Sequence, residues 1–243
     1  MSILKAKNVA IIGASGALGK ALVENLSKDN DTKNIFAFSR KTILFSSEKV
    51  QTHSIDFEEE DSIFRASNCI SKLMPLDLII VATGILHDVN LYPEKSLKDL
   101  STEKFQKLFL INTIGPALVA KHFFPLLRRD KRAISATLSA RVGSVSDNQL
   151  GGWYAYRASK AALNIIIKNS AIEISRKNTN SIVVGMHPGT VASNLSKPFQ
   201  KGVPSGKLFT PELAASRLLN VLSTLRAEDT GKCFAWDGKE ILP

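Results

Sequence analysis

Short apolar runs alternate with longer amphipathic stretches along this chain, and that alternation constrains the fold more than any other feature. The short runs have the length of strands, which we expect near Asn8–Ile12, Ile35–Phe38, Val50–Ser54, Leu78–Ala82, Ala133–Leu138, Ser181–Met186 and Lys232–Ala235. Apolar residues recur at helical spacing over Leu18–Lys28, Glu58–Lys72, Ser101–Arg129, Tyr154–Arg176 and Pro211–Leu225. Alternating strands and helices form parallel sheets that are covered on both faces. The sequence therefore predicts an α/β fold of the Rossmann type, with a doubly wound, mostly parallel sheet of seven strands.

The 243 residues are predicted to form one domain that spans residues 1–243. An α/β sheet of this length can bury its core as one unit, and the sequence contains no internal repeat or long linker. Pro116 and Pro125 are expected to interrupt the third helical stretch. Residues 193–210 are rich in Lys, Pro, Ser and Gly and lack periodicity, so we predict a mobile flap there.

The formal net charge of +10 raises the question of an anionic partner. Lys and Arg are scattered, and the clusters around Arg40 and Arg128 are too short to follow a nucleic-acid groove, so we expect no nucleic-acid role. Met1–Lys5 leads directly into the first strand, and no run of about 18 consecutive apolar residues follows. We therefore expect no signal peptide, no membrane association and a cytoplasmic protein. The histidines do not stand at metal-ligand spacing, so no metal site is predicted.

A glycine-rich turn follows the first expected strand. Gly13, Gly16 and Gly19 recur at every third position, and the residues after them have helical periodicity. Glycines allow a tight turn and close approach of the backbone to a pyrophosphate, whose charge is stabilised at the positive end of the helix. Strand, glycine turn and helix in this order predict dinucleotide binding by Gly13, Ser15, Gly16, Ala17, Leu18 and Gly19.

The end of the second expected strand indicates which dinucleotide binds. An NAD-selective protein places a carboxylate there to accept the ribose hydroxyls. This chain instead has Ser39, Arg40 and Lys41. A guanidinium can contact a 2′-phosphate through two hydrogen bonds and can stack on adenine, so we predict NADP(H) rather than NAD(H). The alternative is an ordinary solvated Arg-Lys pair.

Tyr156 and Lys160 lie one helical turn apart at the start of the fourth expected helix and therefore share a face. A phenol with a pKa of about 10 is a poor acid at neutral pH, but a nearby ammonium stabilises the phenolate. The pair predicts proton transfer to a common ligand. By itself, this spacing is equally compatible with an ordinary helix surface.

Three further features support a catalytic site near this pair. Asn112 stands within an apolar helical run, where a buried amide needs a partner. Ser139 follows the fifth strand, where a hydroxyl can orient a substrate oxygen beside Tyr156. A rigid turn after the sixth strand can present backbone groups to a nicotinamide, although a plain loop is the alternative. This turn contains Pro188, Gly189, Thr190 and Val191.

In this order, the motifs resemble those of the short-chain dehydrogenase/reductase family over essentially the whole chain. The resemblance implies an oxidoreductase that moves a hydride between a nicotinamide and a carbonyl or alcohol carbon of a small molecule. In that family a tyrosine exchanges the proton, a lysine holds the ribose and lowers the tyrosine pKa, a serine positions the substrate, and an asparagine anchors a water-linked proton relay. By resemblance these residues are Tyr156, Lys160, Ser139 and Asn112. The residues that would meet the adenine and line the cofactor are Asp56, Phe57, Ala82, Thr83 and Gly84.

The stretch from Ser139 to Lys160 and the turn after His187 are most similar to the C-factor and sniffer-like carbonyl reductase branch. The resemblance favours an NADP-dependent carbonyl reductase. The alternative is a C-factor-like signalling or NADP(H)-sensing protein without physiological turnover. The family also implies a homodimer or a homotetramer, and the sequence does not choose between them.

The identity of the substrate-orienting serine stays open. The gap from Ser139 to Tyr156 is longer than the usual family spacing, and an ungapped match places Ala140 at the serine position. Ser144 is the rival candidate. We favour Ser139 because it stands at the end of a strand.

Overall fold

The computed structural model describes residues 4–70 and 74–243. The strands of its main sheet are β1 (Asn8–Ile12), β2 (Asn34–Ser39), β3 (Val50–Ser54), β4 (Leu78–Val81), β5 (Ala133–Leu138), β6 (Ser181–His187), β9 (Cys233–Ala235) and β10 (Glu240–Ile241). They lie in the order β10-β9-β6-β5-β4-β1-β2-β3, and all pairs except β9 with β10 are parallel. The strand order reverses between β1 and β4, which is the place where doubly wound folds bind ligands.

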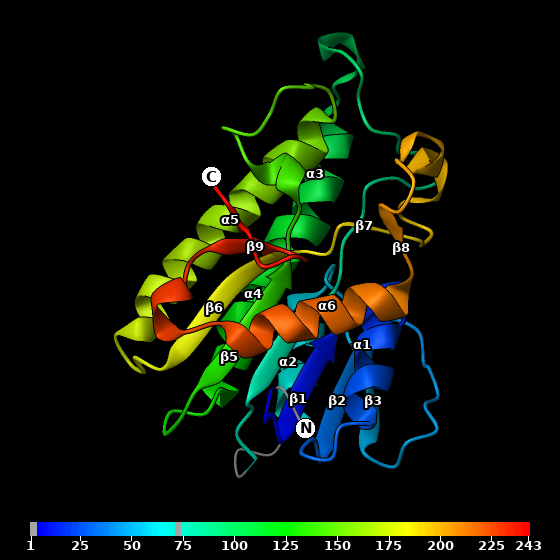
Figure 1. The fold of residues 1–243 in the computed structure, drawn as a ribbon. Coiled ribbons are helices and arrows are strands. Elements are labelled where there is room, and N and C mark those ends of the chain that lie inside the picture. Colours follow the sequence, from blue (N-terminus) through cyan, green and yellow to red (C-terminus); the bar gives the residue numbers. More distant parts are fainter. Residues whose placement is uncertain (1–3, 71–73) are drawn as a thin grey trace.

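Helices cover both faces of this sheet (Figure 1). The α-helices are α1 (Ala17–Ser27), α2 (Glu60–Asn68), α3 (Thr102–Phe109), α4 (Gly115–Phe123), α5 (Tyr154–Ser175) and α6 (Pro211–Thr224). Short 3-10 helices are η1 (Leu97–Asp99), η3 (Phe124–Leu126), η4 (Arg141–Gly143), η5 (Lys197–Gly202) and η6 (Ala227–Asp229), and η2 (Leu110–Ile114) is a π-helical turn. The helices α1 and α6 pack on one face of the sheet, and α2, α4 and α5 pack on the other.

The predicted doubly wound fold is confirmed, and all seven expected strands are present. The prediction of seven strands omitted β10, because two residues are too few to show a pattern. Residues 193–210, the predicted mobile flap, contain η5 and β8 (Leu208–Phe209), which pairs with β7 (Thr190–Val191) above the carboxyl ends of the strands (Figure 1). The mobility of the flap stays a prediction. The end of the second expected helix, Ser71 and Lys72, lies outside the described residues.

The third helical stretch is one continuous path with changes in helix type. The π-helical turn η2 joins α3 to α4, and η3 ends the path. Pro116 occupies the first turn of α4, where no intrahelical N–H is required, so the expected interruption there is wrong. Pro125 lies in η3, where the path ends. By length and composition alone, Thr102–Leu126 could cross a membrane, with a mean hydropathy of 1.2. Its helices α3 and α4 contact α2 and α5.

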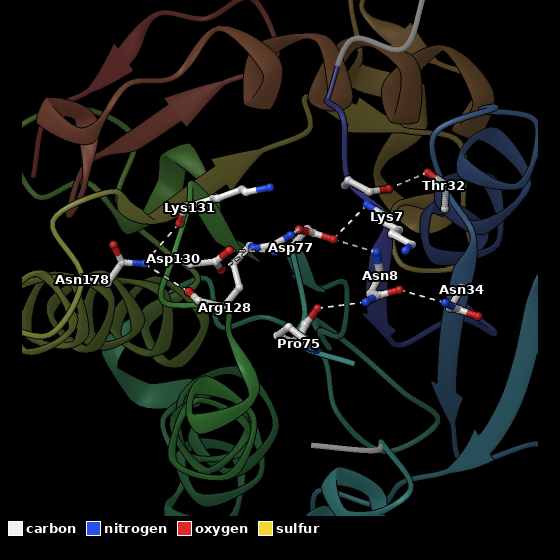
Figure 2. A network of polar contacts seen from close by, with 11 residues as sticks. Lys7, Asn8, Thr32, Asn34, Pro75, Asp77, Arg128, Asp130, Lys131 and Asn178 are labelled. Carbon is white, nitrogen blue, oxygen red and sulfur yellow. Dashed lines mark hydrogen bonds and ion pairs between the residues drawn. The ribbon is translucent and has the colours of Figure 1, made fainter. Parts of the chain in front are cut away.

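A polar network closes the amino edge of the sheet (Figure 2). Asp77 Oδ2 accepts the backbone N–H groups of Lys7 and Asn8 at 2.9 and 2.8 Å, and its Oδ1 pairs with Arg128. Asn178 donates its amide to the carbonyls of Arg128 and Lys131 at 3.1 and 3.3 Å. The network ties β1, β4, β5 and the end of α5 together at the edge opposite to the predicted site.

Candidate active site

A cavity of about 440 Å³ opens at the carboxyl ends of β1, β2 and β4. Predicted residues form much of its wall, namely Gly13, Ser15, Gly16, Ser39, Arg40, Asp56, Phe57, Ala82, Thr83 and Gly84. Sequence reasoning missed Ile55, Glu58, Ile85, Asp88, Lys107 and Ile111. Lys107 of α3 forms an ion pair with Asp88 in the loop after β4, and no local sequence pattern predicts such a pair. The cavity lies at the strand-order reversal, as predicted.

Two glycines of the turn at the floor of this cavity, Gly13 and Gly19, have no room for a side chain. Gly13 has a φ of +92°, and a Cβ atom there would lie 2.9 Å from backbone atoms of Ala82 and Thr83. A Cβ atom on Gly19 would lie 2.1 Å from the Gly13 carbonyl oxygen. The first turn of α1 carries no acidic residue, so its amino-terminal amides are open to an anion. Ala17, Leu18 and Gly19 belong to this first turn rather than to the cavity wall.

The residues that were predicted to select the dinucleotide lie on one side of the cavity. Ser39 is buried, and its hydroxyl donates to the Lys41 carbonyl at 2.5 Å, which fixes the turn after β2. Arg40 lines the cavity with an exposed side chain, and Lys41 is exposed beyond the wall. Across the cavity, Asp56 and the buried Phe57 complete the wall. The guanidinium of Arg40 is therefore free to turn toward a phosphate.

Tyr156 and Lys160 lie in the first turns of α5, with 7% and 3% of their surfaces exposed. The Lys160 Nζ donates to the Leu138 carbonyl oxygen at 2.8 Å, at the end of β5, and lies 6.0 Å from the centre of the Tyr156 ring. A Cβ atom on Gly84 would lie 3.7 Å from this Nζ. The structure thus places Lys160 between the tyrosine and the rim of the cavity.

Burial shifts the pKa values of both groups toward their neutral forms. It raises the pKa of Tyr156 to about 12 and lowers the pKa of Lys160 to about 8. The sequence argument expected the ammonium to lower the tyrosine pKa. Tyr156 is a protonated phenol at neutral pH, as an ordinary tyrosine also is, and the stabilisation of its phenolate by the ammonium stays a prediction.

Asn112 connects the wall of the cavity to α5. It is fully buried in the π-helical turn η2, a helix type that is often found at functional sites. Its amide exchanges two hydrogen bonds of 2.9 Å with the backbone of Ile85 and donates to the Ser159 hydroxyl at 3.2 Å. The partner that the buried Asn112 amide was predicted to need is therefore the backbone of Ile85, in the segment after β4.

The residues around the cavity suit a dinucleotide. Gly13 and Gly19 keep the turn before α1 tight, because a Cβ atom on either would collide with the backbone, and the buried Thr83 hydroxyl has no hydrogen-bond partner among the described residues. The family model described as short chain dehydrogenase matches residues 7–203. This chain belongs to that family. It is therefore an oxidoreductase of the short-chain dehydrogenase family, and its predicted family membership is confirmed.

Relatives support the predicted branch within this family. The C-signal protein of Myxococcus xanthus is 31% identical over 146 residues, covering 60% of this chain and 82% of the relative. The NADPH-bound carbonyl reductase from chicken fatty liver has a TM-score of 0.83 at 21% identity, covering 98% and 99% of the two chains. The carbonyl reductase Sniffer of D. melanogaster gives 0.83 at 20% identity with the same coverage. Likeness at this level of identity shows a shared fold.

The two candidate serine hydroxyls have different hydrogen-bond partners. Ser139 donates to Asn164 Oδ1 of α5 at 2.6 Å. The Ser144 hydroxyl accepts the Asp147 N–H at 3.1 Å. Ala140, which the ungapped match had placed at the serine position, packs in the apolar cluster that contains Tyr156. The substrate-orienting role of Ser139 remains a prediction.

The turn after β6 is held by an aromatic pair. Gly189 has a φ of +75°, and a Cβ atom there would lie 2.6 Å from the Phe209 ring and 2.9 Å from Trp236. Thr190 and Val191 continue as β7. These residues and Pro188 lie outside the wall of the 440 Å³ cavity, so their predicted contact with a nicotinamide stays a prediction. Nearby, burial lowers the pKa of His187 to about 4, which leaves a neutral imidazole.

Sequence reasoning missed the aromatic residues that pack around Tyr156. The Trp153 ring lies 6.2 Å from the Tyr156 ring and 5.0 Å from Phe199 of η5. His87 ties the loop after β4 to the flap, because its Nε2 lies 3.1 Å from the carbonyl oxygens of Asn194 and Leu195. These contacts join distant segments, and no local motif indicates them.

Proposed function

We propose that this protein is an NADP(H)-dependent reductase of aldehydes or ketones in which Tyr156 supplies the proton. One observation carries the proposal: Tyr156 is a buried phenol one turn from Lys160, and Lys160 reaches the rim of the dinucleotide cavity. A general acid must be protonated before the reaction, and a phenol whose pKa is 10 or higher is protonated at neutral pH.

In the proposed mechanism, a bound nicotinamide supplies a hydride to the carbonyl carbon. The carbonyl π electrons move to the oxygen, and the O–H proton of Tyr156 passes to that oxygen to give the alcohol. The ammonium of Lys160 stabilises the phenolate that remains until a proton returns from solvent. Asn112 holds the Ile85 backbone and the Ser159 hydroxyl, which keeps the cavity wall and α5 in register during these steps.

Arg40 supports NADP(H) as the cofactor. It stands at the end of β2, lines the cavity and is exposed, so it can pair with a 2′-phosphate. The chicken-liver structure with the same fold contains NADPH. Both observations favour the phosphorylated dinucleotide.

A second candidate is an NADP(H)-binding signalling protein without turnover, because the chain is similar to the C-signal protein. One experiment separates the two functions. The purified protein is mixed with NADPH and a panel of aliphatic and aromatic aldehydes and ketones, and the nicotinamide absorbance is followed. Carbonyl-dependent oxidation of NADPH supports the reductase. Tight NADPH binding without oxidation by any panel member would favour the signalling protein.

A further inference from the structure

Glu94 is a buried carboxylate in the loop between β4 and α3. Its exposed fraction is 1%, and it forms no ion pair within residues 4–70 and 74–243. Its Oε2 accepts the Ala155 N–H at 3.3 Å, and its backbone carbonyl accepts the Trp153 N–H at 2.6 Å. Its Oε1 is buried without a hydrogen-bond partner in the described part of the chain. Glu94 thus contacts the start of α5 through two oxygens.

The start of α5 needs such a partner. Gly151, Gly152 and Trp153 all have positive φ values, of 61°, 63° and 52°, so the chain enters the helix through three left-handed residues. A left-handed tryptophan is strained, because its side chain crowds its own backbone. The Trp153 side chain forms no capping hydrogen bond with the described residues, and the first turn of α5 contains no acidic residue. Glu94 therefore supplies both a cap and a negative charge at the positive end of a 22-residue helix.

The residues that Glu94 holds stand beside the proton donor. Ala155 directly precedes Tyr156, and Trp153 packs against the Tyr156 ring at 6.2 Å. Because the backbone of the first turn sets where the phenol points, a shift of this turn moves the hydroxyl relative to Lys160. Small misplacements of a reacting group reduce turnover strongly.

A cap that served only stability would not take this form. A buried carboxylate with one unsatisfied oxygen is costly, and a serine or aspartate at the N-cap position would cap the helix at the surface. Costly buried polar groups are concentrated at functional sites. The arrangement is therefore better explained by geometry at Tyr156 than by helix stability.

We propose that Glu94 is a positioning residue for the reaction: through Trp153 and Ala155 it fixes the first turn of α5 and so the direction of the Tyr156 hydroxyl. This inference rests on the proposed reductase function. It assigns Glu94 no contact with the substrate or the cofactor.

The test compares Glu94→Ala, which removes the cap, with Glu94→Gln, which keeps an oxygen opposite the Ala155 amide. Glu212→Ala is the matched control, because Glu212 is an exposed glutamate in the first turn of α6. We expect Glu94→Ala to lower kcat for carbonyl reduction about tenfold, with KM and the Kd for NADPH changed less than about twofold. Glu94→Gln should recover most of kcat, and Glu212→Ala should match the parent protein.

Hydrogen exchange of the Trp153 and Ala155 amides is measured on the same variants without substrate. Faster exchange in Glu94→Ala, restored in Glu94→Gln, supports the contact even if the parent protein reduces no carbonyl, so the two proposals can fail separately. Unchanged exchange in Glu94→Ala overturns the proposal, as does unchanged kcat in an active parent. If Glu94→Ala does not fold, Glu94→Gln decides. Exchange rates and a kcat like those of the parent protein support the hydrogen-bond role. A kcat as low as that of a Tyr156→Phe variant overturns it.

Discussion

At the amino edge of the main sheet, Asp77 accepts two backbone amides and pairs with Arg128 (Figure 2), whereas at the carboxyl edge buried atoms of Thr83, Glu94 and His187 have no hydrogen-bond partner among the described residues. The same sheet and the same helices form both edges. The partnered edge stabilises the fold, because each buried polar group has regained the hydrogen bonds lost with water. At the carboxyl edge, the buried atoms without partners lower the stability of the fold. Burial there shifts the pKa values of Tyr156, Lys160 and His187 toward their neutral forms. The difference indicates that ligand chemistry belongs to the carboxyl edge.

The largest effect is expected from Tyr156→Phe at the carboxyl edge. Removal of one hydroxyl should lower kcat for carbonyl reduction about a thousandfold, because the general acid is lost. The Kd for NADPH should change less than about threefold, because Lys160 and the glycine turn remain. Steady-state assays of NADPH oxidation measure kcat, and a binding titration measures the Kd for NADPH.

Tyr154→Phe is the control, since Tyr154 lies in the same helical turn. Equal losses of activity in both variants would show a general disturbance of α5 rather than loss of a proton donor.

Asp77→Ala tests the opposite edge. We expect a loss of about 3 kcal/mol in the free energy of unfolding, because Arg128 and two backbone amides lose a buried partner. The folded protein should keep its kcat and its affinity for NADPH. Denaturant titration and steady-state kinetics provide the comparison. Asp130→Ala should cost far less, because Asp130 binds the same Arg128 from an exposed position. A fall in kcat without a fall in stability would break the division between the edges.

Arg40→Ala should weaken NADPH binding about thirtyfold, since a charge-assisted pair with the 2′-phosphate contributes about 2 kcal/mol. NADH lacks this phosphate, so its Kd in the same variant is an internal control and should stay nearly constant. Calorimetric titrations give both values. If both dinucleotides weaken equally, Arg40 does not read the phosphate.

The pH dependence of NADPH binding tests the pKa of Lys160. Burial lowers this pKa to about 8, and the ammonium is the form expected to hold the ribose hydroxyls. Affinity should therefore be nearly full at about pH 7 and should fall about tenfold by about pH 9 as the proton is lost. Lys160→Met should bind more weakly with no such fall. A flat profile for the parent protein would contradict the assignment.

The smallest effect is expected from Ser139→Ala. Its single O–H donates to Asn164, so the hydroxyl must rotate away from Asn164 before it can donate to a substrate carbonyl oxygen. We expect kcat/KM to fall about fivefold, and less in Ser144→Ala. The opposite ranking, measured with the same carbonyl substrate, would assign the role to Ser144.

Local patterns predicted most of the fold. The strand, glycine turn and helix around Gly13 fall where expected, because chain-local sterics fix such a turn. Of the cavity wall, Arg40 was predicted from its place at the end of a strand, and Asp56 was predicted from the family resemblance.

The parts that were missed depend on contacts between distant segments. Glu94 and Ala155 are 61 positions apart, and His87 reaches Leu195 across 108 positions. Packing around Tyr156 raises the pKa of its phenol, and a helical spacing cannot reveal such burial. Burial by distant segments therefore changes the pKa of Tyr156 in a way that no local motif indicates.

A crystal structure of the protein with NADP⁺ tests the central claim most directly. We expect the pyrophosphate at the Gly13–Gly19 turn, the 2′-phosphate beside Arg40 and the nicotinamide ring facing the Tyr156 hydroxyl. A nucleotide bound elsewhere, or a Tyr156 hydroxyl that points away from the nicotinamide ring, would contradict the account.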